Sequence, residues 1–502
     1  MSRMVRLFVT IKISNKQVCA LLWKPDRLSP IPIYLQIADR LRIQIDQGEY
    51  PPGSALPSER KLSEQLGVNR STVVLAFTEL RARGFIESRR GSKTLVSANK
   101  WRDAADSTPE WHRYAENGSL LPNTPYLRKI REALSLDPSI IDFASGKLSL
   151  DLSPVEEINE IMKSSFYRPD SENESMLGYP PLRRALAAFL LKYRGIQTTP
   201  ESIIITSGSQ QSLYLITQCL LSHGDAVAVE APSFALSLSM FQSAGIRMYR
   251  LPMDEYGVRP DGLREMHKKY RIKMLFINPN FQNPTGTLLQ EERRRQLLET
   301  ARELRLPVVE DDQFSLTAYD MDVPPPIKAD DDAANILYIG TFSKIAASGL
   351  RIGWIVAPDS VIRRLADARR QMDLGFSVIP QQIAAEFIES PMFLPHLERL
   401  RQELTRKRDL MVEELQKQLG RLVHFAIPHG GLSLWCQIVP EVNDSQLLAE
   451  ALRQGVAYVP GSTYGAAQGY MRITYARPDF TQIPAGISRL GKAVLSVVNR
   501  SN

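Results

Sequence analysis

One lysine of the sequence lies in a setting that favours covalent chemistry. Lys344 follows a short apolar run in the segment GTFSKIAASGLRIGW (residues 340–354), and this run predicts a strand that ends near the lysine. Thr341, Ser343 and, seven residues after the lysine, Arg351 carry donors that can bind one phosphate group together. A lysine amine can condense with an aldehyde to form a Schiff base. The segment therefore predicts an aldehyde-binding lysine next to a phosphate site, whereas an isolated loop lysine is usually only solvated.

Four other segments, each at the end of an expected strand, can complete such a site. Small residues at 207–211 (SGSQQ) lead into a helix, where backbone N–H groups bind an anion readily. Phe234 can stack on a flat ring, and the amide of Asn283 in the loop NPNFQNPTG can bond a ring hydroxyl. A carboxylate from residues 310–312 (EDD), opposite a ring nitrogen, would keep that nitrogen protonated. Each segment has an ordinary structural explanation of its own, but their order along the chain favours one ligand site.

The elements that must position these residues form an alternating pattern. From about residue 130, short apolar runs are separated by helical stretches, which predicts an α/β sheet with helices on both faces. Open sheets of this kind bind ligands at the carboxyl ends of their strands. After about residue 385, amphipathic helices and a few strands predict a smaller subdomain. The expected strands are Ile203–Thr206, Ala226–Glu230, Met274–Asn278, Pro307–Asp311, Ile336–Gly340 and Arg351–Val356.

Residues 130–502 resemble the fold-type I, class-I aminotransferases, which use pyridoxal 5′-phosphate (PLP). The resemblance implies an α/β fold with a large domain around a mostly parallel sheet and a smaller C-terminal α/β domain. It implies that Lys344 is the Schiff-base lysine and that Asp311 pairs with the pyridinium nitrogen. It also implies that Arg472, in MRITYARPD, binds the carboxylate of a substrate or effector. The cofactor-binding residues implied in this way are Ser209, Gln210, Phe234, Asn283, Asp311, Thr341, Ser343, Lys344 and Arg351.

Two departures from the aminotransferase pattern bear on catalysis. The family commonly has a tyrosine two or three residues after the ring-nitrogen aspartate, where this chain has Gln313 and Phe314. The loop FYRPDSENESMLGYPPLRRAL is stretched in the part that usually supplies a tyrosine to the partner's site, and Tyr167 is the candidate for that role. Both departures predict little or no transaminase turnover with cofactor binding retained.

The positive charge of the chain is concentrated at its N-terminal end. Residues 1–100 contain 17 Lys and Arg against 8 Asp and Glu, whereas the remaining 402 residues contain 45 against 47. The net charge of +7 therefore arises in the first fifth of the chain. A polyanionic partner for this end is one explanation, and a solvated basic surface is the other.

Residues 30–98 show the pattern of a winged helix-turn-helix. Apolar residues at helical spacing begin at Tyr34, Ser58 is placed to cap a short helix, and a second helix follows the turn at Gly67. Two short strands then flank a basic turn. In this fold the second of the two helices enters the major groove of DNA. The alternative interpretation is a small helical subdomain with a charged surface that does not bind DNA. The expected DNA-binding residues are Arg60, Asn69, Arg70, Ser71 and Thr72 on the helices, and Arg89, Arg90 and Lys93 on the wing.

Residues 32–94 resemble the GntR-type winged helix over its whole length. The marks of the resemblance are the PPG turn, LPSER, LGVNRSTV and the closing RRGSKT. Lys93 is a departure, because the family usually has a second glycine at this point of the wing. The resemblance implies that double-stranded DNA is a partner of this domain.

Composition excludes several other classes of protein. With 502 residues, 43% of them hydrophobic and 23% charged, the chain is expected to form a globular protein of two or more domains. It contains no apolar stretch of about 18 uncharged residues, and its first residues do not form a signal peptide, so no membrane partner is expected. The three cysteines are far apart and form no CxxC pair. They predict neither a disulfide framework nor a metal site, and favour a reducing cytoplasm.

The combination of a GntR-type winged helix with an aminotransferase-like domain resembles the MocR family of transcriptional regulators. The resemblance covers nearly the whole chain beyond residue 29 and implies a cytoplasmic bacterial regulator, associated with the nucleoid when bound to its operator. It implies PLP as cofactor, PLP itself or a small amine or amino acid as effector, and a domain-swapped head-to-tail homodimer. The expected parts are an N-terminal extension (1–29), the DNA-binding domain (30–98), a linker (99–129) and the PLP-binding, effector-sensing domain (130–502, with its small subdomain at about 385–502).

Two other functions compete with that of a regulator. One is a working aminotransferase with an accessory DNA-binding domain, which turnover of amino donors and 2-oxo acids would reveal. The other is a structural nucleic-acid-binding protein with an inactive cofactor fold. The second is disfavoured because Lys344, Asp311 and Arg351 are all present.

Overall fold

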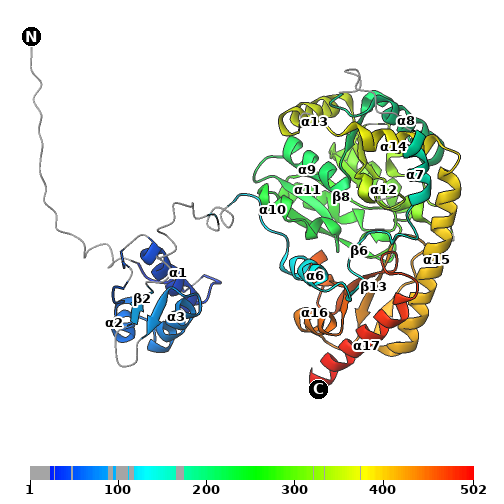
Figure 1. Ribbon diagram of the computed structural model, residues 1–502. Helices are drawn as coiled ribbons and strands as arrows, with labels where there is room; N and C mark the ends of the chain where they lie inside the picture. Colours follow the sequence, from blue (N-terminus) through cyan, green and yellow to red (C-terminus); the bar gives the residue numbers. More distant parts are fainter. Residues whose placement is uncertain are drawn as a thin grey trace, which may run out of the picture. The chain divides into compact units, whose positions relative to one another are not determined.

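The chain divides into two compact units, Met1–Gly118 and Ser119–Asn502 (Figure 1). None of the helices in the part of the chain that is described combines the length and the apolar character needed to cross a membrane. The computed structural model describes residues 23–27, 29–46, 49–51, 53–88, 94–97, 111, 118–164, 175–319, 321–332, 334–346, 348–373 and 375–501.

The first unit packs three helices against a short hairpin, as expected for a winged helix-turn-helix. Its core is formed by apolar residues spaced three and four apart on the helices, including Val73, Ala76, Phe77 and Leu80, which are all buried. The helices are α1 (Ile33–Asp46), α2 (Glu59–Leu66) and α3 (Arg70–Ala82), and the antiparallel strands are β1 (Ile86–Ser88) and β2 (Thr94–Val96).

The turn between α2 and α3 has the local chemistry that its sequence indicates. Ser58 caps α2, since its side chain accepts a hydrogen bond from the backbone N–H of Lys61 at 3.3 Å. Gly67 ends the helix with φ of 63°, a left-handed conformation that glycine adopts at little cost. With the apolar stripe of α3 buried, the opposite face of this helix is exposed.

The second unit is built around a mostly parallel sheet with the strand order β4-β11-β10-β9-β8-β5-β6-β7. Within it, β11 is antiparallel to both β10 and β4, so β4 runs in the same direction as the central strands. The strands are β4 (Ile203–Thr206), β5 (Ala226–Ala231), β6 (Arg247–Asp254), β7 (Gly257–Val258), β8 (Ile272–Ile277), β9 (Val308–Asp311), β10 (Ile336–Thr341) and β11 (Gly353–Val356).

Helices cover both faces of this sheet, which confirms the expected layers. Alternate residues of the strands pack on α9 (Ser209–Leu220), α10 (Ser239–Ser243) and α13 (Asp359–Met372) on one side. The other residues face helices of the opposite side. These are α8 (Pro180–Arg194), α11 (Leu263–Tyr270), α12 (Glu291–Leu304) and α14 (Val378–Glu389).

A smaller sheet, with the order β12-β13-β16-β15, forms the other part of this unit. The N-terminal end of the unit lies in the same part, because α6 contacts β15, and β3 pairs with β14 in a separate two-stranded parallel sheet. Helix α6 begins at Pro125, within the range that the sequence assigned to the linker. The strands are β3 (Ile141–Asp142), β12 (Val423–Phe425), β13 (Ser433–Ile438), β14 (Val456–Ala457), β15 (Val459–Pro460) and β16 (Tyr470–Thr474), and the helices are α6 (Pro125–Leu136), α7 (Val155–Ser164), α15 (Phe393–Gln418), α16 (Asp444–Arg453) and α17 (Gln482–Ser501).

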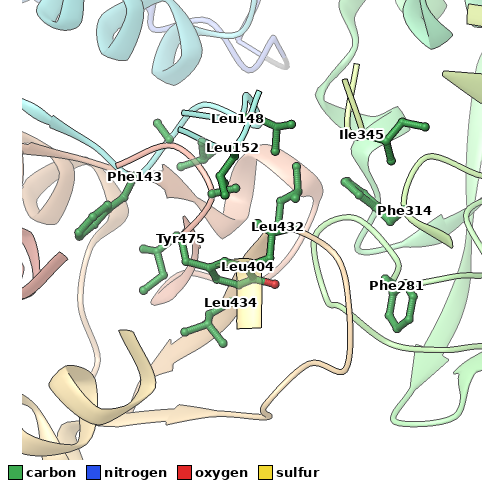
Figure 2. Close-up of a cluster of buried hydrophobic side chains, with 14 of the residues drawn as sticks. Phe143, Leu148, Leu152, Phe281, Phe314, Ile345, Leu404, Leu432, Leu434 and Tyr475 are labelled. Carbon is green, nitrogen blue, oxygen red and sulfur yellow. The ribbon is translucent and has the colours of Figure 1, made fainter. Parts of the chain in front are cut away.

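One hydrophobic cluster joins the large and the small part of the second unit. Figure 2 shows Phe281, Phe314 and Ile345 of the large part on one side, and Leu404 and Leu434 among the residues on the other. The 26-residue helix α15 runs along both parts (Figure 1). Because the buried cluster is continuous, residues of the small part can be held against the strand ends of the large part.

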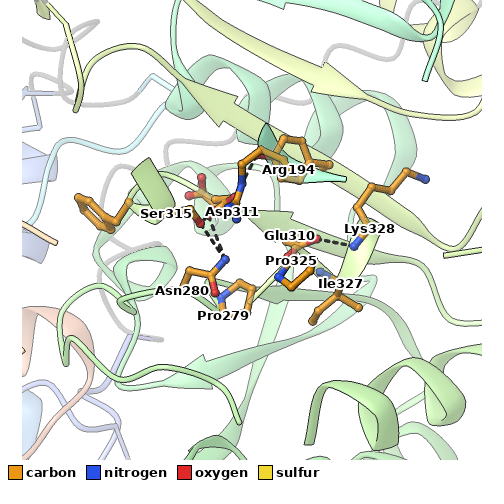
Figure 3. A network of polar contacts seen from close by, with 12 residues as sticks. Arg194, Pro279, Asn280, Glu310, Asp311, Ser315, Pro325, Ile327 and Lys328 are labelled. Carbon is orange, nitrogen blue, oxygen red and sulfur yellow. Dashed lines mark hydrogen bonds and ion pairs between the residues drawn. The ribbon is translucent and has the colours of Figure 1, made fainter. Parts of the chain in front are cut away.

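Buried carboxyl groups lie near the ends of β5 and β9. Both oxygens of Glu310 accept backbone N–H bonds, Oε1 from Ile327 and Oε2 from Lys328, each at 2.9 Å (Figure 3). In Glu230, by contrast, Oε1 accepts both bonds, from Asn278 N and Gln282 Nε2, so that Oε2 can carry a proton. Burial raises the pKa of Glu230 to about 8 and that of Glu310 to about 7.

The two glutamates should respond differently to replacement by glutamine. We expect Glu230→Gln to fold, because the amide oxygen can accept both bonds while the NH₂ group replaces the protonated oxygen. Glu310→Gln should lower the melting temperature, because its NH₂ group would face a backbone N–H. Thermal melts of both variants over a range of pH check this.

The difference in stability between Glu230→Gln and the parent protein should also depend on pH. The raised pKa means that the parent loses stability as pH rises from the ordinary glutamate pKa of 4.5 to about 8, by up to about 1.4 kcal/mol per pH unit. Glutamine does not titrate, so the melting temperature of the variant relative to the parent should increase across this window and level off above it. A difference that does not change with pH would contradict a buried, protonated Glu230.

Candidate functional site

The register of the large sheet brings three separate segments to one edge. Thr341 at the end of β10 pairs with Gly353 at the start of β11, and Gly353 pairs with Thr206 at the end of β4. Since β11 runs in the opposite direction to its neighbours, its beginning lies at the edge where the other strands end. Residues 207–211, 341–344 and 351 are therefore neighbours in space, although they are far apart in sequence.

Lys344 lies just beyond β10 with its amine in the protein interior. Its Nζ donates a hydrogen bond to the carbonyl oxygen of Gly146 at 2.7 Å and lies 5.8 Å from the centre of the Phe314 ring. Burial lowers the pKa of this lysine to about 8, with further lowering by the charges of Arg472 and Arg351 and an opposing effect of Asp311. A substantial fraction of the amine is therefore neutral, and nucleophilic, near physiological pH.

Asp311, the last residue of β9, has one carboxylate oxygen held and one without a partner. Its Oδ2 accepts a hydrogen bond from Gln313 Nε2 at 2.5 Å, whereas Oδ1 is buried and has no hydrogen-bond partner among the described residues. The carboxyl group lines a cavity together with Phe234, and burial raises its pKa to about 7. A buried acceptor of this kind beside an aromatic ring fits a protonated ring nitrogen.

The phosphate-binding residues expected from the sequence surround a close approach of two backbone segments. Arg351 has φ of 52°, and its Nη2 donates to the carbonyl oxygen of Ser207 at 2.8 Å. A Cβ atom at Gly208, where φ is 110°, would lie 3.0 Å from that Nη2.

The other expected phosphate-binding residues carry hydroxyl and backbone donors. Thr341 Oγ1 and Ser343 Oγ are 3.2 Å apart. Helix α9 begins in this region with Ser209, which is half-buried, and Gln210, which is exposed, so hydroxyl, guanidinium and helix N-terminal N–H donors fit one anionic group.

Arg472 brings the small part of the unit to the same site. From β16 it donates to Asn283 Oδ1 at 3.1 Å and to the carbonyl oxygen of Ala144 at 2.6 Å, with its guanidinium 5.2 Å from the centre of the Tyr464 ring. Its Nε is buried without a hydrogen-bond partner among the described residues. The guanidinium is thus oriented by Asn283, and this geometry fits the binding of a carboxylate next to the ring site.

Several contributors to the site gave no usable signal in the sequence. Ala144 and Gly146 act through carbonyl oxygens, which every residue type provides, and Tyr464 reaches the site only through tertiary packing. The bond from Gln313 to Asp311 could have been suspected, because an amide two residues from a buried carboxylate is a plausible donor.

The two departures from the aminotransferase pattern have different outcomes. Phe314 is buried with its ring near Lys344, and Gln313 is bonded to Asp311, so neither position supplies a phenol. Tyr167, the candidate donor to a partner's site, lies outside the described residues.

In the first unit, the expected DNA-binding residues of the helices lie together. Asn69, Arg70 and Ser71 are exposed at the N-terminus of α3, and Thr72 is half-buried. Arg70 Nη2 lies 3.3 Å from Glu59 Oε2, an ion pair within the unit that DNA must displace if Arg70 is to bond a base. On α2, Arg60 is similarly paired with Glu64 at 3.1 Å. The wing residues Arg89, Arg90 and Lys93 lie outside the described residues.

Two apolar side chains extend the exposed face of α3. Val74 and Leu75 are 38% and 54% exposed, four and five residues after Arg70. Apolar side chains on a recognition helix can contact thymine methyl groups. The helical spacing in the sequence places both residues opposite the buried stripe, and the sequence reasoning overlooked them.

Comparisons with known families divide the chain in the same way. The family described as aminotransferase class I and II matches residues 138–490, and the gntR family of bacterial regulatory proteins matches residues 33–96. The chain is 37% identical over 477 residues to the uncharacterized HTH-type transcriptional regulator YdfD of Bacillus subtilis (strain 168). The match covers 94% of this chain and 98% of that protein, so the similarity includes both domains.

Solved structures match the second domain. The kynurenine aminotransferase of Pyrococcus horikoshii, in complex with PMP, has 31% identity and a TM-score of 0.70, covering 77% of this chain and 98% of its own. LysN, the α-aminoadipate aminotransferase of Thermus thermophilus, complexed with N-(5′-phosphopyridoxyl)-L-leucine, has 29% identity and a TM-score of 0.67, covering 80% and 99%. The fold of the second unit is therefore that of the fold-type I aminotransferases.

The charges around Lys344 should set its pKa in opposite directions. In protein freed of any cofactor, Arg472→Gln should raise the pKa of Lys344 above about 8, because a nearby positive charge is removed, and Asp311→Asn should lower it. The pKa can be followed by NMR after reductive ¹³C-methylation, with Lys344→Arg identifying the signal. Shifts of the same sign in both variants would contradict this electrostatic account.

Proposed function

Because the chain belongs to the aminotransferase class I and II family and carries a gntR-type DNA-binding domain in front of it, the layout of MocR-type regulators, we propose that it is a PLP-dependent transcriptional regulator. In this proposal the winged helix binds a specific operator, and the aminotransferase-like domain senses PLP or a PLP-bound amino compound. The regulator acts as a head-to-tail homodimer with exchanged DNA-binding domains. The observation that carries the proposal is that Lys344 and Asp311 are present at the strand ends, whereas Gln313 and Phe314 supply no phenol.

The donor set of the site supports PLP as the cofactor. Lys344 offers a partly neutral amine to the aldehyde, and the unpartnered Oδ1 of Asp311 can accept a bond from the ring nitrogen. Ser209, Gln210, Thr341, Ser343 and Arg351 can hold the phosphate, Phe234 can stack on the ring, and Asn283 can bond its hydroxyl. When bound, PLP supplies an electrophilic aldehyde and an electron-withdrawing ring. The residues of the chain bind and orient this group.

A sensing role is supported by the hydrogen bonds that Lys344 and Arg472 donate. Both donate to carbonyl oxygens of one short segment, Lys344 to Gly146 and Arg472 to Ala144. Ligands that engage these two donors compete with the carbonyl oxygens of that segment. Along the chain the segment follows β3 and α6, the first helix after the DNA-binding unit. A ligand can change DNA affinity only through different affinities for two states, and this segment offers contacts that differ between them.

The test of the proposal is operator binding with and without the ligands. Footprinting on the upstream region of the gene should show a protected site whose affinity changes when PLP, or PLP with an amino acid, is added. Lys344→Ala should lose the visible absorbance of lysine-bound PLP and the response to PLP, while retaining DNA binding. Arg472→Ala should keep PLP and lose the response to amino acids, because the carboxylate clamp is removed. Operator affinity that is unchanged by every ligand would contradict a sensor.

An aminotransferase with a DNA-binding appendage is the alternative, favoured by the similarity to solved aminotransferases. Phe314 cannot donate a hydrogen bond to a ring oxygen, and a loosely oriented substrate can cost about a hundredfold in rate. We therefore expect amino acids to change the absorbance of bound PLP without sustained release of 2-oxo acids. Turnover of about one per second or more would instead establish the enzyme.

Arg70 and Arg60 should contribute to DNA binding in different ways. Arg70→Ala should weaken operator binding by about 1–3 kcal/mol and relax the preference for one base pair, since a bidentate contact to guanine is lost. Arg60→Ala, at a phosphate-contacting position, should weaken binding to all sequences alike and reduce the salt slope by about one unit. Gel shifts at several salt concentrations, with operator and random DNA, distinguish the two.

A third variant tests the ion pair of Arg70. Glu59→Gln removes the competing carboxylate, so it should raise operator affinity slightly, by no more than about fivefold, because exposed ion pairs are weak. In the background of Arg70→Ala this gain should disappear. Equal losses on operator and random DNA in Arg70→Ala would contradict a base contact.

A further inference from the structure

We propose that Gln313 is the residue that positions Asp311 for the cofactor: its side-chain amide fixes Oδ2 and leaves Oδ1 as the acceptor for the ring nitrogen. The inference rests on the proposed binding of PLP. It assigns a function to a residue that stands where the aminotransferases that this chain resembles commonly have a tyrosine. Gln313 is a positioning residue, because it acts on the cofactor through Asp311.

The contact between the two side chains is short and isolated from solvent. Gln313 Nε2 donates to Asp311 Oδ2 at 2.5 Å, and the two residues are 6% and 8% exposed. Among the described residues, this is the hydrogen bond that the Asp311 carboxylate accepts, since Oδ1 has none. Gln313, Asp311 and Phe234 line the same cavity. One oxygen is thus fixed by a neutral donor, and the other is a buried acceptor without a protein partner among the described residues, on a residue that lines the same cavity as Phe234.

The carboxylate of Asp312, the next residue in the sequence, is paired with a charged donor instead of a neutral one. Asp312 Oδ2 lies 3.2 Å from Arg194 Nη2 and accepts a bond from the Tyr338 hydroxyl at 3.0 Å. Its Oδ1 accepts bonds from Asn280 and Ser315, which Figure 3 shows beside the end of β9. An arginine neutralises this carboxylate and all its contacts are internal. Asp312 therefore stabilises the fold and has no acceptor left for a ligand.

A neutral donor at Asp311 has a specific advantage over a charged one. A cation bonded to Oδ2 would compensate the carboxylate and weaken its attraction for a pyridinium ion. An apolar residue would leave both oxygens without a partner in a buried space, which raises the pKa of the acid and favours its neutral form. The amide of Gln313 adds no charge, orients the carboxylate, and lowers its pKa against the larger effect of burial.

The test uses the full-length protein with PLP and two variants with opposite electrostatic effects. Gln313→Met keeps the length of the side chain and removes the donor, so the PLP dissociation constant should rise by about ten- to a hundredfold. Affinity for PLP should decline on the acid side as Asp311 is protonated. In Gln313→Met this decline should move to higher pH, because the hydrogen bond that lowers the pKa of Asp311 is lost. Gln313→Lys should weaken PLP binding as well, but should move the decline to lower pH.

Fluorescence titration with PLP over a range of pH measures both quantities. Gln446→Met, at an exposed glutamine of α16, is the matched control and should behave as the parent. Shifts of opposite sign in the two variants support the inference, since a merely structural contact would not move the pH profile in two directions. If Gln313→Met does not fold, the shift in Gln313→Lys decides. Parent-like affinity and pH profile in the variants would overturn the inference, whereas a parent protein that binds no PLP would overturn the proposed function itself.

Discussion

Two cations, Lys344 and Arg472, and one carboxylate, Asp311, lie in the buried space at the carboxyl edge of the large sheet. The other contacts of the site depend on the balance of these three charges. Burial and the charge of Arg472 lower the pKa of Lys344, while the charge of Asp311 opposes this effect. Carbonyl oxygens of Gly146 and Ala144 and the amide oxygen of Asn283 accept hydrogen bonds from these two cations without adding charge. The site therefore retains a net attraction for an anionic ligand with a phosphate and a carboxylate, and its lysine is partly neutral.

This charge arrangement requires the two parts of the second unit to be fixed against each other. Arg472 belongs to the small sheet, whereas its partner Asn283 belongs to a loop of the large part. The hydrophobic cluster that runs from Phe314 and Ile345 to Leu434 and Tyr475 gives this junction its rigidity (Figure 2). A close-packed junction has discrete arrangements and does not deform continuously. A ligand bridging Lys344 and Arg472 would therefore act on the relation between the two parts.

The sequence was sufficient for the fold and for the ends of the strands, because these depend on local patterns. All six expected strands are present with small shifts at their ends, and the apolar stripe of α3 is buried as its spacing indicates. Strand β6, with the sequence RMYRLPMD, was not predicted, because polar and charged residues interrupt its apolar pattern. The antiparallel direction of β11 and the contacts of Ala144, Gly146 and Tyr464 depend on tertiary packing, which has no local signature.

The residues at positions 313 and 314 are the reason for proposing a receptor in place of a catalyst. A catalyst needs donors that follow the charge developing on the cofactor, and a phenol near the ring oxygen is one of them. Here Phe314 provides an apolar surface beside Lys344, and Gln313 uses its donor to hold Asp311. Both residues leave intact the contacts that can bind a phosphate-bearing ring, and neither provides a phenol that would promote its conversion. A regulator gains from this balance, because its response depends on the difference in affinity between two states, and a ligand consumed at the site would no longer report its own concentration.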